Sequence, residues 1–358
     1  MAISRTFWEE KIVLITGHTG FKGSWLSIWL NMLGANLHGY ALEPTTWPNM
    51  FETAGVKKII KSNIGDIRDY NKLLAAMKKC QPQIVFHLAA QSLVRRSYKE
   101  PLETYQTNIL GTANLLEAAR YVKSVRAVIV ITSDKCYENK ESNHAYKESD
   151  PLGGYDPYSS SKACAEIVTA ALRDSFFADL SVAVASARAG NVIGGGDWAQ
   201  DRLVPDCIKT WVKNKTVEIR YPKAIRPWQH VLEPLAGYII LAEKLYKHGK
   251  KFARAWNFGP NENNVKPVGT IVDSLANLWG KKAKWKIKTK KQPHEAMLLK
   301  LNCSMAKTKL PWKPRWNIEK ALEKTVQWYK THLRNPKNAI AITLEQINQY
   351  MRDSKCIR

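Results

Sequence analysis

Lys11-Ile-Val-Leu-Ile-Thr-Gly-His-Thr-Gly-Phe-Lys-Gly23 is the stretch that decides the fold of this 358-residue chain. Residues 12–15 are a short apolar run, as expected of a strand that is buried on both faces. Glycines follow at positions 17, 20 and 23, and beyond them apolar residues recur at helical spacing, at Leu26, Trp29, Leu30 and Leu33. A strand, a glycine loop and a helix together can bind a pyrophosphate through backbone N–H groups at the helix start. The stretch therefore predicts a dinucleotide-binding unit rather than an ordinary strand-to-helix turn.

The second predicted strand, residues 36–42, bears on which dinucleotide this unit binds. Dinucleotide folds often place an acid near the end of this strand to bind the adenosine ribose, and the only candidate is Glu43, which comes slightly late. Residues 37–49 include no arginine for a 2′-phosphate. These features favour NAD over NADP, although Lys22 and His18 in the glycine loop could also serve a phosphate.

Composition limits the class of protein. Hydrophobic residues make up 45% of the chain, enough to bury a sizeable core, and no apolar run approaches the ~20 residues of a membrane span. The N-terminus lacks the regions of a signal peptide. The six cysteines are scattered without C-x-x-C spacing, as expected of reduced thiols in a cytoplasmic protein. We expect no membrane association and no metal site.

The chain is strongly basic, with 55 Lys and Arg against 31 Asp and Glu and a net charge of +24. Such a charge permits nucleic-acid binding and also attracts small anionic substrates. The densest lysine run lies in residues 281–291, where lysines alternate with Ala283, Trp285 and Ile287 as in a strand with one solvated face. Because the sequence has no aromatic-and-basic platform for RNA, we expect no nucleic-acid partner, and a non-catalytic basic protein is the less favoured alternative.

Strands and helices alternate through the first half of the chain. Strands are predicted at 59–61, 84–88, 127–132 and 181–186, and helices at 102–120 and 157–177. This alternation predicts an α/β fold with a Rossmann-type doubly wound parallel sheet. After Gly190 the segments shorten, and helices are expected at 233–247, 270–279 and 318–331. We expect an NAD-binding domain of residues 1–187, with returning segments near 228–262, and a smaller, irregular substrate-binding lobe of residues 188–227 and 263–358.

Tyr158-Ser-Ser-Ser-Lys162 is the first of two patterns that predict chemistry. Asp156 and Pro157 suit the N-cap and first residue of a helix, which places Tyr158 and Lys162 one turn apart on the same face. An ammonium beside a phenol favours the phenolate and lowers the pKa of the tyrosine towards working pH. Tyr158 could then take a proton from a substrate hydroxyl. Many helices contain this spacing by chance, but its position after a glycine loop and several β/α units gives it weight.

Thr132-Ser-Asp134-Lys135, at the end of the strand predicted at 127–132, is the second pattern. Strand ends of an open parallel sheet face the crevice where ligands bind. Thr132 is placed to hydrogen-bond the same hydroxyl as Tyr158, and Asp134 and Lys135 offer an adjacent proton donor and acceptor. The alternative is that Ser133 and Asp134 merely turn the chain and Lys135 is exposed. The Tyr158–Lys162 pair favours the catalytic interpretation.

Several motifs resemble the sugar-nucleotide 4,6-dehydratase group of the extended short-chain dehydrogenase/reductase family. The G-x-x-G-x-x-G spacing at 17–23 is typical of that family, and similar motifs lie at 65–69, 87–91, 132–137, 155–162, 188–198 and 225–231. The motifs at 17–23, 133–137 and 225–231 resemble more narrowly the branch that acts on CDP-glucose. Most of the group carries Glu where this chain has Lys135, whereas the CDP-glucose branch carries Lys. The resemblance covers residues from about 7 to 350.

The resemblance implies a redox-neutral dehydration that uses NAD catalytically. Tyr158 would act as base at the C4 hydroxyl of the hexose, with Lys162 tuning it and Thr132 holding the oxygen. The resulting 4-ketone acidifies C5–H, so Lys135 would remove that proton while Asp134 protonates the C6 hydroxyl as water leaves. This requires a protonated Asp134 and a neutral Lys135, forms that mutual burial favours. CDP-glucose would become CDP-4-dehydro-6-deoxyglucose, a precursor of the deoxysugars of lipopolysaccharide O-antigens.

Binding residues of the family carry over to matching positions of this chain. The cofactor candidates are Gly17, His18, Thr19, Gly20, Phe21, Lys22, Gly23, Asp66, Ile67, Leu88, Ala89, Ala90, Tyr158 and Lys162. In the family, an acid at the position of Asp66 accepts a hydrogen bond from the adenine amino group. The substrate candidates are Gln91, Asn191, Arg202, Arg226 and His294, of which Asn191 and Arg226 match phosphate-binding positions. Relatives pair through helices at 102–120 and 157–177, which implies a homo-oligomer, either a dimer or a tetramer.

Other functions stay open at this point. One is a 4,6-dehydratase that acts on GDP-mannose or dTDP-glucose, and another is a nucleotide-sugar 4-epimerase or 4-reductase. An epimerase or reductase needs Tyr158 and Lys162 but no acid/base pair after Thr132, so Asp134 and Lys135 discriminate between these classes. The choice of cytosine rests on the resemblance alone.

Overall fold

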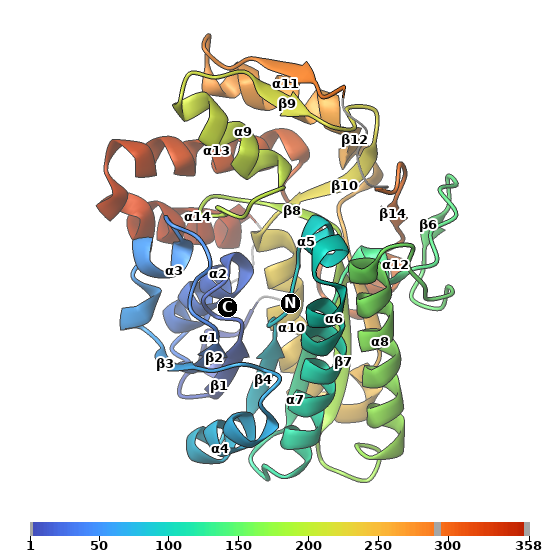
Figure 1. Ribbon diagram of the computed structural model, residues 1–358. Helices are drawn as coiled ribbons and strands as arrows, with labels where there is room; N and C mark the ends of the chain where they lie inside the picture. Colours follow the sequence, from blue (N-terminus) through green and yellow to red (C-terminus); the bar gives the residue numbers. More distant parts are fainter. Residues whose placement is uncertain (1–2, 290–294, 354–358) are drawn as a thin grey trace.

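A seven-stranded parallel sheet forms the base of the molecule. The computed structural model describes residues 3–289 and 295–353. The strand order is β11-β7-β5-β4-β1-β2-β3, and every neighbouring pair is parallel. Figure 1 shows the sheet in the lower part of the molecule. The strands are β1 (Ile12–Thr16), β2 (Asn36–Ala41), β3 (Lys61–Ile64), β4 (Ile84–His87), β5 (Ala127–Ile131), β7 (Ala183–Ala189) and β11 (Ala255–Phe258). This arrangement confirms the predicted Rossmann-type doubly wound sheet.

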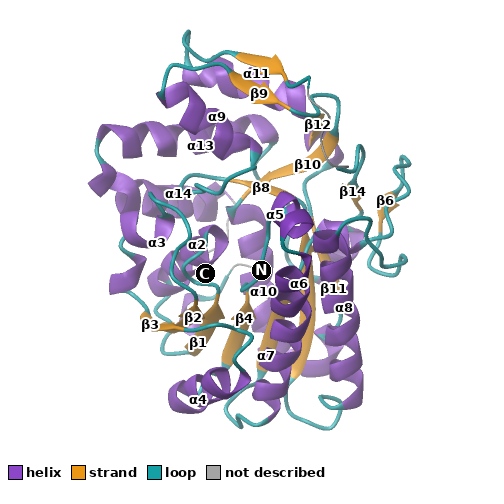
Figure 2. Cartoon of the chain, in the orientation of Figure 1, coloured by secondary structure: helices purple, strands orange, loops and turns teal. Residues whose placement is uncertain are grey.

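Helices cover both faces of the sheet because the central strands are apolar on both faces (Figure 2). Val13 and Ile15 belong to the core that includes α2 (Phe21–Met32) and α10 (Leu232–His248). Leu14 of the same strand belongs to a separate core on the opposite face. The helices of that core are α4 (Tyr70–Cys80) and α7 (Gly111–Arg120), and α7 packs against α8 (Pro157–Ser175). The carboxyl ends of the strands are thereby left at one edge, where ligands bind in such folds.

A second group of short elements lies beyond this edge, at the top of Figure 1. Its central strand β10 pairs in parallel with β8 and antiparallel with β12, and β9 pairs with β13. These strands are β8 (Asn191–Ile193), β9 (Val217–Ile219), β10 (Ile225–His230), β12 (Val265–Pro267) and β13 (Trp285–Ile287). Their helices are α9 (Leu203–Val212), α11 (Val268–Trp279) and α13 (Ile318–Arg334).

The remaining elements are short connections and one long C-terminal helix. The helix α14 (Ala339–Asp353) contacts both α13 and α2, and so joins the two groups of elements. The short helices are α1 (Arg5–Trp8), α3 (Met50–Thr53), α5 (Val94–Lys99), α6 (Pro101–Tyr105) and α12 (Ser304–Lys309). The pair β6 (Ala145–Tyr146) and β14 (Lys300–Leu301) forms a separate two-stranded sheet. Single turns of 3₁₀-helix lie at 56–58, 134–136, 249–252, 262–264 and 336–338.

Four predicted elements differ from the structure, one of them the strand predicted at 181–186, which is Ala183–Ala189. The third strand is Lys61–Ile64 rather than 59–61, because Val56–Lys58 forms a 3₁₀ turn and Ile60 packs into the core just after it. The helix predicted at 102–120 begins at Pro101 and contains a π-helical turn, Gln106–Leu110. Within the lysine run at 281–291, only Trp285–Ile287 is a strand, and Lys290 and Lys291 lie outside the described residues.

Two of the expected absences concern a membrane span and a metal site. Over 3–289 and 295–353, no helix combines the length and the apolar character that crossing a membrane requires. The same residues contain no group of three or more His, Cys, Asp and Glu side chains arranged to hold a metal ion.

Candidate active site

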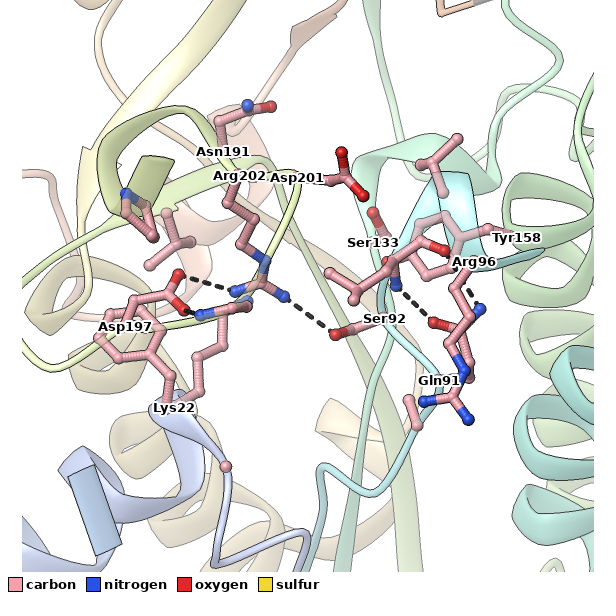
Figure 3. A pocket seen from close by; sticks show the side chains of 18 of the residues that line it. Lys22, Gln91, Ser92, Arg96, Ser133, Tyr158, Asn191, Asp197, Asp201 and Arg202 are labelled. Atoms are coloured by element: carbon pink, nitrogen blue, oxygen red, sulfur yellow. Dashed lines mark hydrogen bonds and ion pairs between the residues drawn. The ribbon is translucent and has the colours of Figure 1, made fainter. Parts of the chain in front are cut away.

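A cavity of about 690 Å³ lies where the strand ends meet the second group of elements. Its walls include the glycine loop, the ends of β4 and β5, and the N-terminal turn of α8. On the other side they include β9, β10 and the loop before α9. Figure 3 shows side chains from both sides pointing into this space. The cavity thus lies at the crevice that open α/β sheets use for ligands.

The glycine loop fits a dinucleotide. Gly17 has φ +74°, and a Cβ at this position would lie 2.7 Å from the backbone nitrogen of Ala89. A Cβ at Gly23 would lie 2.2 Å from the backbone oxygen of Gly17. Only glycine allows the loop to lie this close to β4 and to the start of α2. Gly20 is the N-cap of α2, so the backbone N–H groups of the first turn border the cavity and suit a pyrophosphate.

The predicted cofactor residues line the cavity with one exception. His18 does not border it, because its imidazole is fully buried, hydrogen-bonded through Nε2 to Ser62 Oγ at 2.7 Å and in edge contact with the ring of Phe51. The imidazole of His18 therefore does not face the cavity, and the assignment of His18 to the cofactor stays a prediction. The carboxylate of Asp66 does border the cavity, but it accepts hydrogen bonds from the guanidinium of Arg68 at 2.5–3.0 Å. Glu43, the late ribose candidate, does not line this cavity.

Tyr158 and Lys162 both line the cavity from the first turns of α8. Asp156 caps this helix by accepting a hydrogen bond from Ser159 N at 2.9 Å, and Pro157 is its first residue, as predicted. Tyr158 is 8% exposed and Lys162 is 5% exposed. The ammonium of Lys162 donates to the backbone oxygen of Ile131 at 3.4 Å. The pair therefore sits beside the end of β5.

Burial governs the protonation of this pair. It raises the pKa of Tyr158 to about 12, and the charge of Asp134 adds to the shift, whereas a hydrogen bond with Ser133 and the charge of Arg202 oppose it. It lowers the pKa of Lys162 to about 8, against the effect of the Glu166 carboxylate. Burial therefore outweighs the lowering effect expected of Lys162 on the pKa of Tyr158. Additional positive charge in the cavity would be needed to favour the phenolate.

Thr132 does not hold the position predicted for it. Its hydroxyl lines the cavity but donates to Glu166 Oε1, so its proton is not available to a substrate. The neighbouring Ser133, which sequence reasoning missed, acts on Tyr158 instead by lowering the pKa of its phenol, and the two side chains lie close together (Figure 3). Ser133 Oγ also donates to Asp134 Oδ1 at 3.0 Å. The hydroxyl that pairs with Tyr158 is therefore that of Ser133.

Asp134 and Lys135 follow in a single 3₁₀ turn. Asp134 is 1% exposed, and among the described residues its Oδ2 has no hydrogen-bond partner. Lys135 is half-buried, and both residues line the cavity. A buried carboxyl oxygen without a partner is costly unless a ligand or a proton satisfies it. The pair can therefore supply an acid and a base on the same side of the cavity as Tyr158.

The predicted substrate residues are brought together only in part. Asn191 and Arg226 line the cavity, and Arg226 is almost fully buried. Arg202 bridges the two sides, because it donates to Asp197 Oδ2 and to Ser92 Oγ, each at 2.9 Å (Figure 3). Gln91 borders the cavity, but its side-chain amide bonds Leu93 and Thr104 within the protein. His294 lies outside the described residues.

The π-helical turn fixes the loop that carries Gln91. Asn108 in this turn accepts a hydrogen bond from Gln91 N at 2.8 Å and donates to Gln91 O at 3.0 Å. It also donates to Ser161 Oγ at 2.8 Å, on the helix that carries Tyr158. Its buried amide is thus hydrogen-bonded through both its oxygen and its nitrogen, and it ties the end of β4 to α8.

The model of the family described as GDP-mannose 4,6 dehydratase matches residues 14–325. The CDP-glucose 4,6-dehydratase of Salmonella typhimurium is 50% identical over 354 residues, which cover 98% of each chain. This chain belongs to the sugar-nucleotide 4,6-dehydratases. The dTDP-glucose 4,6-dehydratase of Haemophilus influenzae is a more distant member, 27% identical over 88% of this chain and 97% of that one. The family resemblance of the motifs is therefore confirmed.

Solved structures show the same fold in other members and relatives of this family. The dTDP-glucose 4,6-dehydratase of Bacillus anthracis, solved in complex with NAD, has a TM-score of 0.74 at 22% identity and covers 90% of this chain and 97% of its own. The UDP-glucose 4-epimerase of Stenotrophomonas maltophila, with bound NAD, has a TM-score of 0.78 at 20% identity and covers 91% and 99%. At these identities the likeness establishes the fold.

Proposed function

We propose that this chain catalyses the dehydration of CDP-D-glucose to CDP-4-dehydro-6-deoxy-D-glucose with NAD as catalytic cofactor. The observation that carries the proposal is the placement of Asp134 and Lys135 beside Tyr158 in one cavity. A dehydratase needs this extra acid and base, whereas a 4-epimerase needs only the tyrosine and lysine. The choice of CDP-glucose is supported by the 50% identical relative of that name.

NAD is held by the glycine loop and the end of β4, where Gly17, Gly20 and Ala89 border the cavity. Bound there, the cofactor would supply the hydride acceptor for C4 of the hexose and the hydride donor for C6, so that the reaction would be redox-neutral overall. Tyr158 takes the proton of the C4 hydroxyl, and Ser133 holds the oxygen through its hydrogen bond. Lys162 stabilises the phenolate that forms.

Asp134 and Lys135, which follow Ser133, carry out the elimination. The 4-ketone acidifies the proton on C5, which Lys135 removes. Asp134 delivers a proton to the C6 oxygen, which leaves as water. Asp134 Oδ2 is buried and has no hydrogen-bond partner among the described residues, so it is available to hydrogen-bond a ligand in the cavity. Asn191, Arg202 and Arg226 bind the diphosphate, for which the planar guanidinium groups are suited.

Incubation of the purified protein with CDP-, dTDP-, UDP- and GDP-hexoses tests this function directly. We expect a 4-keto-6-deoxy product from CDP-glucose, identified by mass spectrometry and NMR. If only another nucleotide sugar gave this product, the proposed substrate would be wrong and the proposed reaction would stand. A 4-epimer as the only product would contradict the dehydratase.

Steady turnover should produce no net NADH. The hydride removed from C4 returns at C6, so the nicotinamide absorbance should stay constant while the 4-keto-6-deoxy product accumulates. The measurement follows both signals in one reaction with excess CDP-glucose and added NAD. NADH that rises in step with product would indicate a plain dehydrogenase.

Ser133 and Thr132 should respond differently to loss of their hydroxyls. Ser133→Ala removes the partner of Tyr158 and should lower kcat about 10²-fold with little change in thermal stability. Thr132→Val removes a buried donor to Glu166 and should cost about 1–3 kcal/mol of stability, with a smaller effect on kcat. Denaturant unfolding and kcat of the two variants check this. A large loss of kcat in Thr132→Val, with only a small one in Ser133→Ala, would instead support Thr132 as the residue that holds the substrate oxygen.

Three further proposals follow from the family. The chain forms a homo-oligomer, a dimer or tetramer, through the outer face of the helices from α6 to α8, where Leu102, Leu110 and Ile167 are 74%, 56% and 54% exposed. It works in the cytoplasm, where deoxysugar precursors are made. Residues 1–187 with 228–262 form the NAD-binding domain, and 188–227 with 263–358 form the lobe that binds the sugar nucleotide.

A further inference from the structure

A buried ion pair lies directly behind the catalytic residues. Glu166 of α8 and Arg188 of β7 are 3% and 4% exposed at their side chains and meet at 2.8 Å. Glu166 also accepts hydrogen bonds from Thr132 Oγ1 and, at 2.6 Å, from Ser186 Oγ. Burial alone would raise the pKa of Glu166, but the Arg188 charge and these hydrogen bonds outweigh it, so the pKa is lowered and the group is a carboxylate.

Glu166 follows Lys162 by one helical turn, on the same face of α8. The groups that act electrostatically with Lys162 come from several elements: Glu166 from its own helix, Cys136 from the turn after β5, His87 from β4 and Lys22 from α2. Of these, the carboxylate of Glu166 is the charged group that favours the ammonium of Lys162. Burial of the lysine works in the opposite direction.

Glu166 also joins three elements at the end of β5. Thr132 follows β5, Ser186 lies in β7 and Glu166 belongs to α8. The residue after Thr132 is Ser133, whose hydroxyl meets both Tyr158 and Asp134. The carboxylate therefore holds the Thr132 side chain, together with the backbone hydrogen bond from Thr132 N to Ala187 O at 3.0 Å, at the end of β5 that leads to Ser133 and Asp134.

We propose that Glu166 is a positioning residue of the dehydratase, which keeps Lys162 charged in its buried site and anchors the end of β5 that carries Ser133 and Asp134. Arg188 holds the carboxylate in place and keeps it ionised. The catalytic consequence rests on the proposed function, whereas the effect on Lys162 does not. Tyr158, Lys162 and Glu166 recur at four-residue spacing along one face of α8.

The direct test is the titration of Lys162 by NMR in protein labelled with ¹³C at the lysine side chains, without substrate. The signal is assigned by its loss in Lys162→Met. Glu166→Gln keeps the shape and removes the charge, so the Lys162 midpoint should fall by about one pH unit or more. The double variant Glu166→Gln/Arg188→Gln removes both charges and therefore leaves no unpaired buried cation. It replaces the single variant if that one fails to fold, and its Lys162 midpoint should show the same fall. Glu166→Asp should bring the midpoint back towards the wild-type value.

Glu233→Gln is the matched control, because Glu233 is also fully buried but lies outside the cavity and is bonded by Trp316 and Tyr350. It should leave the Lys162 midpoint in place. In the enzyme assay, the alkaline limb of the pH profile for NAD reduction should move to lower pH in Glu166→Gln, and Glu166→Asp should restore the limb but not the full rate. An unchanged Lys162 midpoint in both Gln variants would overturn the proposal. A wild-type enzyme inactive on CDP-glucose would instead contradict the proposed function and leave the NMR result intact.

Discussion

Tyr158→Phe should fold as the wild type does and turn over at least about 10³-fold more slowly, since a general base typically contributes 10²–10⁴. The phenyl ring fills the same buried space at the start of α8, so packing is kept. What is lost is the oxygen that takes the C4 proton and bonds Ser133. The loss of one such hydrogen bond costs about 1 kcal/mol of stability, too little to unfold a domain. Product formation from CDP-glucose and the thermal midpoint are the two measurements.

Tyr155→Phe is the control for this variant. Tyr155 lies three residues earlier, is 80% exposed and does not line the cavity. It should keep the wild-type rate. A folded Tyr158→Phe enzyme of near-normal activity would mean that another group takes the C4 proton.

Lys135→Ala and Asp134→Asn should both stop the reaction after oxidation at C4. That step depends on Tyr158, Ser133 and Lys162, which these substitutions leave in place. Elimination needs a base at C5 and an acid at C6, and each positioned group contributes about 10²–10⁴ in rate. Alanine cannot take the C5 proton, and an amide cannot protonate the leaving oxygen. Each variant should therefore form enzyme-bound NADH and a 4-keto-hexose in a single turnover and then stall.

Nicotinamide absorbance and exchange of the C5 proton in heavy water distinguish the two roles. Lys135→Ala should lose the exchange, whereas Asp134→Asn should retain more of it, because its base is intact. Lys140→Ala is a matched control, since Lys140 is 73% exposed at its side chain and lies outside the cavity. Normal C5 exchange in Lys135→Ala would exclude Lys135 as the base. Folded variants that fail to reduce NAD at all would assign the pair to substrate binding or oxidation instead.

Local patterns predicted those parts of the fold that local forces determine. The glycine loop and its strand and helix were predictable because close backbone approach demands glycine at fixed spacing. The third strand was misplaced because it is an edge strand whose residues are largely exposed, so no apolar run marks it. The π-helical turn left no local signal, because it serves the contacts of Asn108 with Gln91 and Ser161, which lie 17 and 53 residues away.

The same distinction holds in the site. Tyr158 and Lys162 were predictable because helical spacing alone places them on one face. In the extended segment after β5, side chains alternate in direction, and which of Thr132 and Ser133 meets Tyr158 depends on Glu166, 34 residues after Thr132. The burial of the His18 imidazole was missed for a similar reason, since its partner Ser62 belongs to a distant strand. The pKa of Tyr158 depends on burial, which motif spacing does not reveal.

Strand β11 comes late in the sequence, and this has a consequence for folding during synthesis. All seven residues of β7 are buried, and one of its two neighbours in the sheet, β11, begins only at Ala255, after the segment 190–254. On the ribosome, a nascent chain that ends before this point presents an unpaired apolar strand edge, which is prone to pair with other chains. We expect such nascent chains to need chaperone protection, and the seven-stranded sheet to complete its folding only after the segment 190–254, part of which lines the cavity, has been made.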